Sequence, residues 1–207
     1  MINVYVVRHG QTDTNKSKKI NGATTDLPLN DTGIAEAQAL RASWDPKKID
    51  YVYSSPLIRA VQTANIIMDQ PDQLEIDDRL TELNYGSWDG AYVPPLKEKY
   101  PQAFDGFGYL NDQYSNYCTG EGYAHLAQRL APFWQDLVSQ HAGQNVLVVC
   151  HGAVSRALVQ NALQVPKIMQ IVQMKNTGVV NLAYDETEKF TSMRYYNRLA
   201  PADFFLD

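Results

Sequence analysis

The stretch VYVVRHG, residues 4–10, is an apolar run that stops abruptly at an arginine and a histidine. A second run of the same kind, VLVVC at 146–150, is followed directly by another histidine and glycine. Near-continuous apolar runs are typical of strands that are buried on both faces, and such strands occur mostly in parallel sheets. The two stretches therefore predict a largely parallel central sheet that is covered by helices on both sides.

The rest of the chain alternates between strand-like and helical patterns. Strands are expected at 3–7, 51–54, 74–77, 145–150, 178–185 and 190–196. Helices are expected over 31–42 with Asn30 as N-cap, after Pro56, over 123–140 where apolar residues recur at spacings of three and four, and from Gly152 to about 163. This alternation predicts the α/β class, as a three-layer α/β/α sandwich in a single domain over residues 1–207.

Residues 85–123, called here the aromatic segment, differ from their surroundings because they are dense in glycine, proline and aromatic rings. Long connections in compact domains are usually functional. We expect an inserted lid or specificity segment with little regular structure. Some rings should pack on one another, while Trp88, Tyr92 and Tyr109 are candidates to shape a substrate pocket.

The composition excludes several classes of function. The net charge is −5 and no Lys/Arg run is present, so binding to nucleic acid is not expected. No apolar stretch approaches the length of a membrane helix, about 20 residues, and the N-terminus lacks a basic leader. The two cysteines, Cys118 and Cys150, are too few for a disulfide scaffold and are not spaced as zinc ligands. We expect a cytoplasmic protein without a metal site.

Three strand ends carry similar chemistry: VVRHG at 6–10, VYSSPLIRA at 52–60 and VVCHGAVSR at 148–156. If these strands are parallel, Arg8, His9, Arg59 and His151 meet at one edge of the sheet. Such a cluster repels itself unless it holds an anion. Arginine forks match phosphate oxygens, and the helix start at Gly152 adds backbone N–H donors, so the pattern indicates a phosphoryl site.

A neutral histidine in such a site can attack phosphorus and form a phosphohistidine. The departing alkoxide then needs a proton, which a carboxylic acid of raised pKa supplies. Glu82, just after the third predicted strand and at the start of the aromatic segment, is the best-placed donor.

Four motifs in this order resemble those of the histidine phosphatase superfamily, in its phosphoglycerate mutase-like branch: RHGQT with Asn15, SSPLIRAVQTA, LTELNYGSWDG and VVCHGAVSRAL. The resemblance extends over almost the whole chain. It implies the phosphoglycerate mutase-like fold and makes His9 the phosphorylated nucleophile and Glu82 the proton donor. It places Arg8, Arg59 and a charged His151 around the phosphoryl group, and it implies no metal and no cofactor.

The same resemblance implies further substrate contacts from Asn15 and from the backbone of Gly152 and Ala153. Gln11 is also counted as substrate-binding, although it stands where the family often has glutamate. Cys150, His125 and His141 read more simply as structural residues. Lys16, Lys18 and Lys19 read more simply as a solvated loop, with contact to a second anionic group of the substrate as the alternative.

The resemblance leaves the reaction open between two outcomes. The segment after Glu82 has Lys97 and Lys99 but no arginine, which favours a phosphatase acting on a small phosphomonoester of apolar or aromatic character over a cofactor-dependent phosphoglycerate mutase. A non-catalytic protein that binds a phosphorylated ligand is the rival from another class. A nucleotide-binding Rossmann protein is excluded because the first strand is not followed by a G-x-G-x-x-G turn. The partner expected is a small phosphorylated molecule, and a homodimer is left open.

Overall fold

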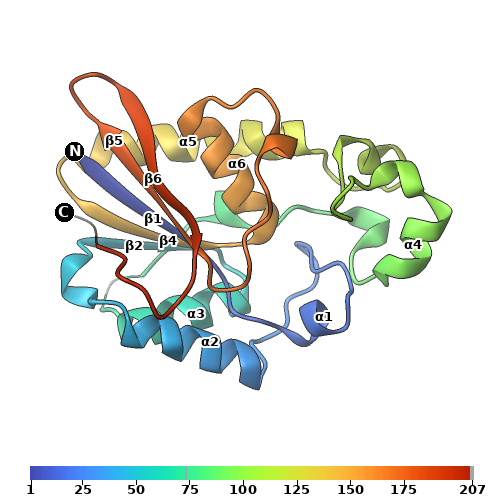
Figure 1. The fold of residues 1–207 in the computed structure, drawn as a ribbon, viewed down its shortest axis with the longest axis horizontal. Helices are drawn as coiled ribbons and strands as arrows, with labels where there is room; N and C mark the ends of the chain where they lie inside the picture. Colours follow the sequence, from blue (N-terminus) through green and yellow to red (C-terminus); the bar gives the residue numbers. More distant parts are fainter. Residues whose placement is uncertain (73, 206–207) are drawn as a thin grey trace.

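A computed structural model describes residues 1–72 and 74–205. These residues form a six-stranded sheet of order β3-β2-β4-β1-β5-β6 (Figure 1). Its strands are β1 (Ile2–Arg8), β2 (Tyr51–Ser54), β3 (Glu75–Ile76), β4 (Asn145–Cys150), β5 (Val179–Asp185) and β6 (Phe190–Arg198). Strands β1 to β4 run parallel, whereas β5 and β6 join as an antiparallel edge. The mainly parallel sheet is confirmed.

Helices cover both faces of the sheet. α2 (Asp31–Ala42) and α3 (Ile58–Met68) lie on one face, and α5 (Tyr123–Gln140) and α6 (Gly152–Leu163) lie on the other (Figure 1). Side chains of β1 alternate between the two layers: Val4 and Val6 join the core with α5 and α6, while Tyr5 and Val7 join the core with α2 and α3. This double burial explains the continuous apolar run and confirms the three-layer sandwich.

Local signals set the helix ends near the site. Asn30 caps α2, as predicted, because its side chain accepts a hydrogen bond from the Gly33 amide. A one-turn helix that the sequence analysis did not include, α1 (Asp13–Lys16), follows the first strand. Thr12 and Asn15 form a capping box at its start, in which each side chain bonds the other's backbone. α1 thereby fixes Asn15 a short distance after His9.

The expectation of little regular structure in the aromatic segment is wrong. The aromatic segment contains α4 (Val93–Lys99) and three 3₁₀ turns, η3 (Gly86–Trp88), η4 (Pro101–Ala103) and η5 (Asp112–Asn116). Proline in the first turn favours the start of α4 and of η4. The rings build a small core of their own: Trp88 packs on Tyr100 at 5.4 Å between centroids, and Tyr114 on Tyr123 at 5.3 Å. Packing of the aromatic rings therefore stabilises regular structure in a segment whose glycine and proline content predicted a loop.

The helices of the described residues include none that is both long and apolar enough to cross a membrane.

Candidate active site

The register of the sheet brings the two histidines together. β1 and β4 are neighbours in which Arg8 pairs with Cys150, so the residue after each strand emerges at the same edge. The His9 amide donates to the Cys150 carbonyl at 3.0 Å. The rings of His9 and His151 lie 5.2 Å apart between centroids. The predicted convergence at the strand ends is therefore seen in the structure.

His9 is held as a neutral imidazole. Its Nδ1 lies 2.7 Å from the Gly10 carbonyl oxygen. A carbonyl only accepts, so Nδ1 carries the proton and Nε2 keeps its lone pair. Burial, followed by the charges of Arg59 and Arg8, lowers the pKa of His9 well below its ordinary value. The free lone pair on Nε2 makes this residue a competent nucleophile at neutral pH.

The two arginines, Arg8 half-buried and Arg59 fully buried, are oriented by carbonyl groups. Arg8 Nη1 donates to the Met174 carbonyl at 2.6 Å, and Arg59 donates from Nη1 to Thr25 at 2.5 Å and from Nη2 to Gly22 at 3.1 Å. In the described part of the chain neither guanidinium forms an ion pair within 4.0 Å. The Nε atoms of both are buried without a hydrogen-bond partner. Both side chains are thus prepared to bind an anion.

His151 adds a third buried donor. Its Nε2 lies 2.7 Å from Ser55 Oγ, which accepts the Leu57 amide at 3.3 Å. Among the hydrogen bonds of the described residues, Nε2 is the one acceptor for the Ser55 hydroxyl proton. We therefore assign the ring proton to Nδ1, which is buried without a partner. Burial, Arg59 and His9 lower the pKa of His151 well below its ordinary value. Burial and the nearby arginines both disfavour the charged form of His151 that was expected from sequence.

Glu82 is the buried acid of the site, with 5% of its surface exposed. Its Oε1 accepts the Leu83 amide at 2.8 Å and its Oε2 accepts the Ala153 amide at 3.3 Å. Burial raises the pKa of Glu82 more than these bonds and Arg59 lower it. Burial thus favours the protonated form of this carboxyl relative to that of an exposed glutamate. The Ala153 amide, expected to contact the substrate, is occupied by Glu82 instead.

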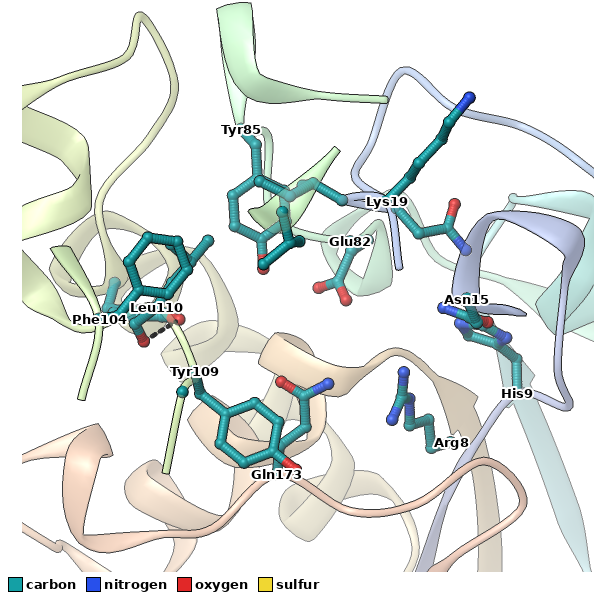
Figure 2. Close-up of a pocket in the computed structure, with 15 residues that line it drawn as sticks. Arg8, His9, Asn15, Lys19, Glu82, Tyr85, Phe104, Tyr109, Leu110 and Gln173 are labelled. Carbon is teal, nitrogen blue, oxygen red and sulfur yellow. Dashed lines mark hydrogen bonds between the residues drawn. The ribbon is translucent and has the colours of Figure 1, made fainter. Parts of the chain in front are cut away.

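A pocket opens over Arg8, His9 and Glu82, whereas Arg59 and His151 lie outside its lining (Figure 2 shows the lining residues). Arg8, His9, Asn15 and Glu82 line one side of it. Asn15 Oδ1 accepts the Thr12 amide at 3.1 Å, which leaves the amide nitrogen of Asn15 turned toward the cavity (Figure 2). The pocket thus brings His9, Glu82, Arg8 and Asn15 into one space.

The opposite wall of the pocket is apolar and aromatic. It includes Tyr85, Val93, Phe104, Tyr109, Leu110 and Tyr123. Among the three rings expected to shape this pocket, Tyr109 lines it. Trp88 is instead buried in the small core, and Tyr92 is half exposed outside the lining. Buried rings gain more from packing than from exposure to a polar cavity, which explains why Trp88 turns away.

Five of the expected contacts lie outside this lining: Arg59, His151, Gln11, Gly152 and Ala153. The Gln11 side chain is bound elsewhere: its oxygen accepts a hydrogen bond from Asn30 Nδ2 at 3.2 Å. The backbone amide of Gln11 donates to the Glu36 carboxylate at 2.8 Å. Gly152 begins α6 directly after His151 and directs the positive end of that helix to this edge. Its closest approach is to the Gln173 side chain, 2.8 Å from where a Cβ would stand.

Several residues of the site were missed in the sequence. Ser55 orients His151, Asn176 Nδ2 donates to the His9 carbonyl at 2.9 Å, and Gln173 lines the pocket. Ser55 stands inside a quoted motif, so its place beside a strand end was a usable signal. Gln173 and Asn176 lie in a loop without periodicity, and only the folded chain brings them to the site.

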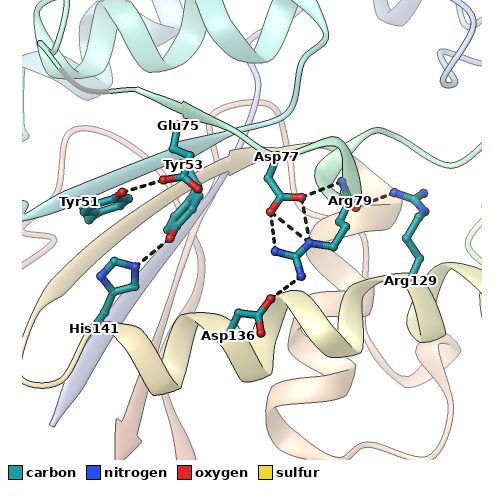
Figure 3. Close-up of polar contacts among 8 residues, drawn as sticks. All are labelled: Tyr51, Tyr53, Glu75, Asp77, Arg79, Arg129, Asp136 and His141. Atoms are coloured by element: carbon teal, nitrogen blue, oxygen red, sulfur yellow. Dashed lines mark hydrogen bonds and ion pairs between the residues drawn. The ribbon is translucent and has the colours of Figure 1, made fainter.

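The segment that leads to Glu82 is braced from α5 (Figure 3). Arg129 Nη1 donates to the carbonyls of Arg79 and Thr81, at 2.6 and 2.9 Å. Arg79 in turn forms ion pairs with Asp77 and Asp136, each at 2.6 Å. These contacts hold the backbone immediately before Glu82 against the long helix.

The other histidines and Cys150 have structural roles. His141 is buried and bonds the Tyr53 hydroxyl at 2.9 Å, while His125 is exposed and lies 3.3 Å from Glu121 (Figure 3 shows His141). Cys150 is fully buried, and burial raises the pKa of its thiol. Nowhere in residues 1–72 and 74–205 do three or more histidine, cysteine or acidic side chains gather as metal ligands.

Comparison with known proteins agrees with this geometry. A family model described as "Histidine phosphatase superfamily (branch 1)" matches residues 4–197. "Phosphoglycerate mutase-like protein 4" of Arabidopsis thaliana is 33% identical over 91% of this chain and 82% of its own length. "Phosphoserine phosphatase 1" of Hydrogenobacter thermophilus is 30% identical over 76% of this chain and 74% of its own. The solved structure "Bacillus stearothermophilus YhfR" superposes with a TM-score of 0.83, at 26% identity, over 97% of this chain and 98% of its own.

Proposed function

Because the chain belongs to the histidine phosphatase superfamily, we propose that it hydrolyses small phosphomonoesters through a phosphohistidine formed on His9. One observation carries the proposal. Arg8 Nε, Arg59 Nε and His151 Nδ1 are buried donors without partners, and all three side chains lie near His9: its ring is 5.2 Å from the His151 ring, and burial together with the charges of Arg59 and Arg8 lowers its pKa. A buried donor left unpaired costs about 1–3 kcal/mol, and a phosphoryl group satisfies all three at once.

In the first step, His9 Nε2 attacks phosphorus. The P–N bond forms as the ester P–O bond breaks, and the electron pair of that bond goes to the leaving oxygen. Glu82 in its protonated form donates the proton that releases this oxygen as an alcohol. In the second step, the Glu82 carboxylate accepts a proton from water, the oxygen of that water attacks phosphorus, and the P–N pair returns to Nε2.

The cationic groups stabilise the transferring oxygens throughout. Arg8 and Arg59 are oriented before substrate arrives, so little reorganisation is needed in the transition state. A bound phosphoryl dianion opposes the cationic surroundings that lower the pKa of His151. We propose that substrate binding favours the imidazolium form of His151.

The aromatic wall supports substrates with an apolar or aromatic leaving group. Phe104, Tyr109 and Leu110 give non-directional contacts, and Lys19 and Gln173 are the polar groups beside them in the lining. Because one relative is named a phosphoserine phosphatase, phosphoserine belongs in the first panel tested. Phosphate release should be measured for phosphoserine, phosphotyrosine, sugar phosphates and p-nitrophenyl phosphate, with and without chelator. We expect turnover that chelator does not change and that is lost in His9→Ala.

The second candidate is a phosphoglycerate mutase, since another relative carries a mutase-like name. The arrangement of the lysines favours the phosphatase. Lys97 and Lys99 do not line the pocket, and Lys99 lies over the Tyr100 ring at 5.1 Å. Robust isomerisation of 3-phosphoglycerate that depends on 2,3-bisphosphoglycerate would identify a mutase. Phosphate release without isomerisation identifies the phosphatase.

We further propose a cytoplasmic location, which the two free cysteines support. A homodimer stays a prediction that the mass of the protein in solution tests.

A further inference from the structure

Asp89 lies at the start of the aromatic segment and outside the pocket lining, yet its carboxylate accepts four hydrogen bonds. Oδ1 accepts the Gly22 amide at 2.8 Å and the Thr25 hydroxyl at 2.7 Å. Oδ2 accepts the amide and hydroxyl of Thr24, at 2.7 and 2.5 Å. All four donors belong to the loop of residues 22–25. One carboxylate thus holds this loop.

The same loop holds Arg59 from its other side. The Thr25 and Gly22 carbonyls accept one hydrogen bond from each terminal nitrogen of the guanidinium. These two bonds fix both ends of a planar fork and therefore the direction of its remaining donors, including the unpartnered Nε. The two residues whose carbonyls hold Arg59 are also residues that Asp89 binds.

The loop has little freedom to move while these bonds persist. The Ala23 amide donates to the Leu83 carbonyl at 3.2 Å, next to Glu82. A Cβ at Gly22 would lie 2.7 Å from the Tyr85 ring and 2.8 Å from an Asp89 carboxylate oxygen, so only glycine fits. Burial alone would raise the pKa of Asp89, but the bonds from Thr24, Thr25 and Gly22 outweigh it and keep the group ionised.

We propose that Asp89 is a positioning residue for phosphoryl transfer: its carboxylate fixes the 22–25 loop, and the loop carbonyls aim the Arg59 guanidinium at the phosphoryl group. The inference rests on the proposed phosphate-binding role of Arg59. A plain structural role, in which Asp89 only ties the aromatic segment to the loop, predicts a different result because it does not act through Arg59.

The test is a double-mutant cycle with Asp89→Asn and Arg59→Lys. Asparagine keeps the size of the side chain but presents an N–H₂ group to the Thr24 amide. Lysine keeps the charge, so residual anion binding stays measurable, but it lacks the fork that the two carbonyls hold. The readouts are inhibition by orthovanadate, which mimics the transferring phosphoryl group, and kcat and KM on p-nitrophenyl phosphate.

We expect Asp89→Asn to weaken vanadate inhibition on the order of tenfold in the wild-type background, the size of one lost charged hydrogen bond. In the Arg59→Lys background the same change should weaken inhibition less than about twofold, because Asp89 affects vanadate only by positioning the arginine. Asp185→Asn is the matched control: its carboxylate also accepts backbone amides, from Thr187 and Glu188, in the turn between β5 and β6. It should change neither readout.

Equal losses in both backgrounds would overturn the proposal and leave the structural role. No loss in the wild-type background would overturn it as well. If Arg59→Lys itself leaves vanadate inhibition unchanged, the phosphate-binding role of Arg59 fails, and the inference fails with it. Should Asp89→Asn lower the melting temperature too far, Thr24→Val removes only the hydroxyl bond to Oδ2 and should show the same dependence on Arg59 at smaller size.

Discussion

The two walls of the pocket are built in opposite ways. The wall at the sheet edge consists of charged and polar groups that strand register and backbone carbonyls hold in place, as for His9 and Arg8. The wall from the aromatic segment consists of rings, among which Tyr109 reaches the cavity while Trp88 packs beneath the surface. Directional bonds fix the first wall, and non-directional packing fixes the second. This difference fits the proposed function, in which the sheet edge carries the reaction and the aromatic segment selects the substrate.

The largest expected effect comes from removing the nucleophile. His9→Ala leaves the arginines in place but abolishes the covalent route, so turnover should fall on the order of 10⁴-fold or more for every substrate. Steady-state phosphate release measures the loss, and binding of inorganic phosphate to the variant serves as the control for an intact pocket. Turnover retained on one ester class would mean that the wall at the sheet edge does not carry the reaction alone.

Glu82→Gln should cost about 10²- to 10⁴-fold on esters with poorly activated leaving groups, the range typical of one acid–base group. The cost should be much smaller on p-nitrophenyl phosphate, whose leaving group needs little protonation. The ratio of kcat/KM values for the two esters measures this. An equal loss on both would point to a role in binding and contradict the assignment of Glu82 as proton donor.

The pH profile of kcat/KM should be bell-shaped and displaced toward acid. Activity needs His9 neutral, so the rate rises with pH through a pKa lying below 6.5, because burial and the arginines lower it. Activity also needs Glu82 protonated, so the rate falls through a pKa that lies above 4.5, because burial raises it. The two limbs are macroscopic values of coupled groups. If the Glu82→Gln variant still loses activity at alkaline pH, a group other than Glu82 causes that loss and the assignment is wrong.

The smallest effects are expected at the aromatic wall. Tyr109→Ala removes one ring from the lining, which is worth about tenfold in kcat/KM for a substrate that contacts it. Substrates with small leaving groups should change little, so the order of preference shifts while the rate constant of the phosphoryl step stays. Trp88→Phe, in the core beneath, should alter the melting temperature more than the preference. The same panel of esters tests both variants.

More of the residues at the sheet edge than in the aromatic wall could be predicted from the sequence. Arg8 ends a buried strand and His9 and His151 each follow one, so their convergence follows from a parallel sheet. The same pattern of strand ends included Arg59, and Glu82 was chosen for its position after the third strand and then by the motif resemblance; in the structure the two side chains interact electrostatically. The orientation of the two guanidinium groups could not be predicted. It depends on carbonyls of distant loops, that of Met174 for Arg8 and that of Thr25 for Arg59.

The second wall could be recognised only by composition. Glycine, proline and rings predicted a loop, whereas the segment folds into α4 and short 3₁₀ turns around packed rings. A ring that is useful in a pocket and a ring that is useful in a core look alike in sequence, so Tyr109 could not be separated from Trp88. Polar side chains are equally hard to place from sequence. Gln11 was expected to face a substrate, but its side chain accepts a hydrogen bond from Asn30 in the folded protein.

The most direct test of the account is to trap the phosphorylated enzyme. Substrate labelled with ³²P is mixed with protein, quenched in denaturant within milliseconds and digested at alkaline pH, where phosphohistidine survives. The account predicts an acid-labile label on the peptide that contains His9, present in the wild-type protein and absent in His9→Ala. Rapid turnover without any labelled peptide, or a label that persists in His9→Ala, would contradict it.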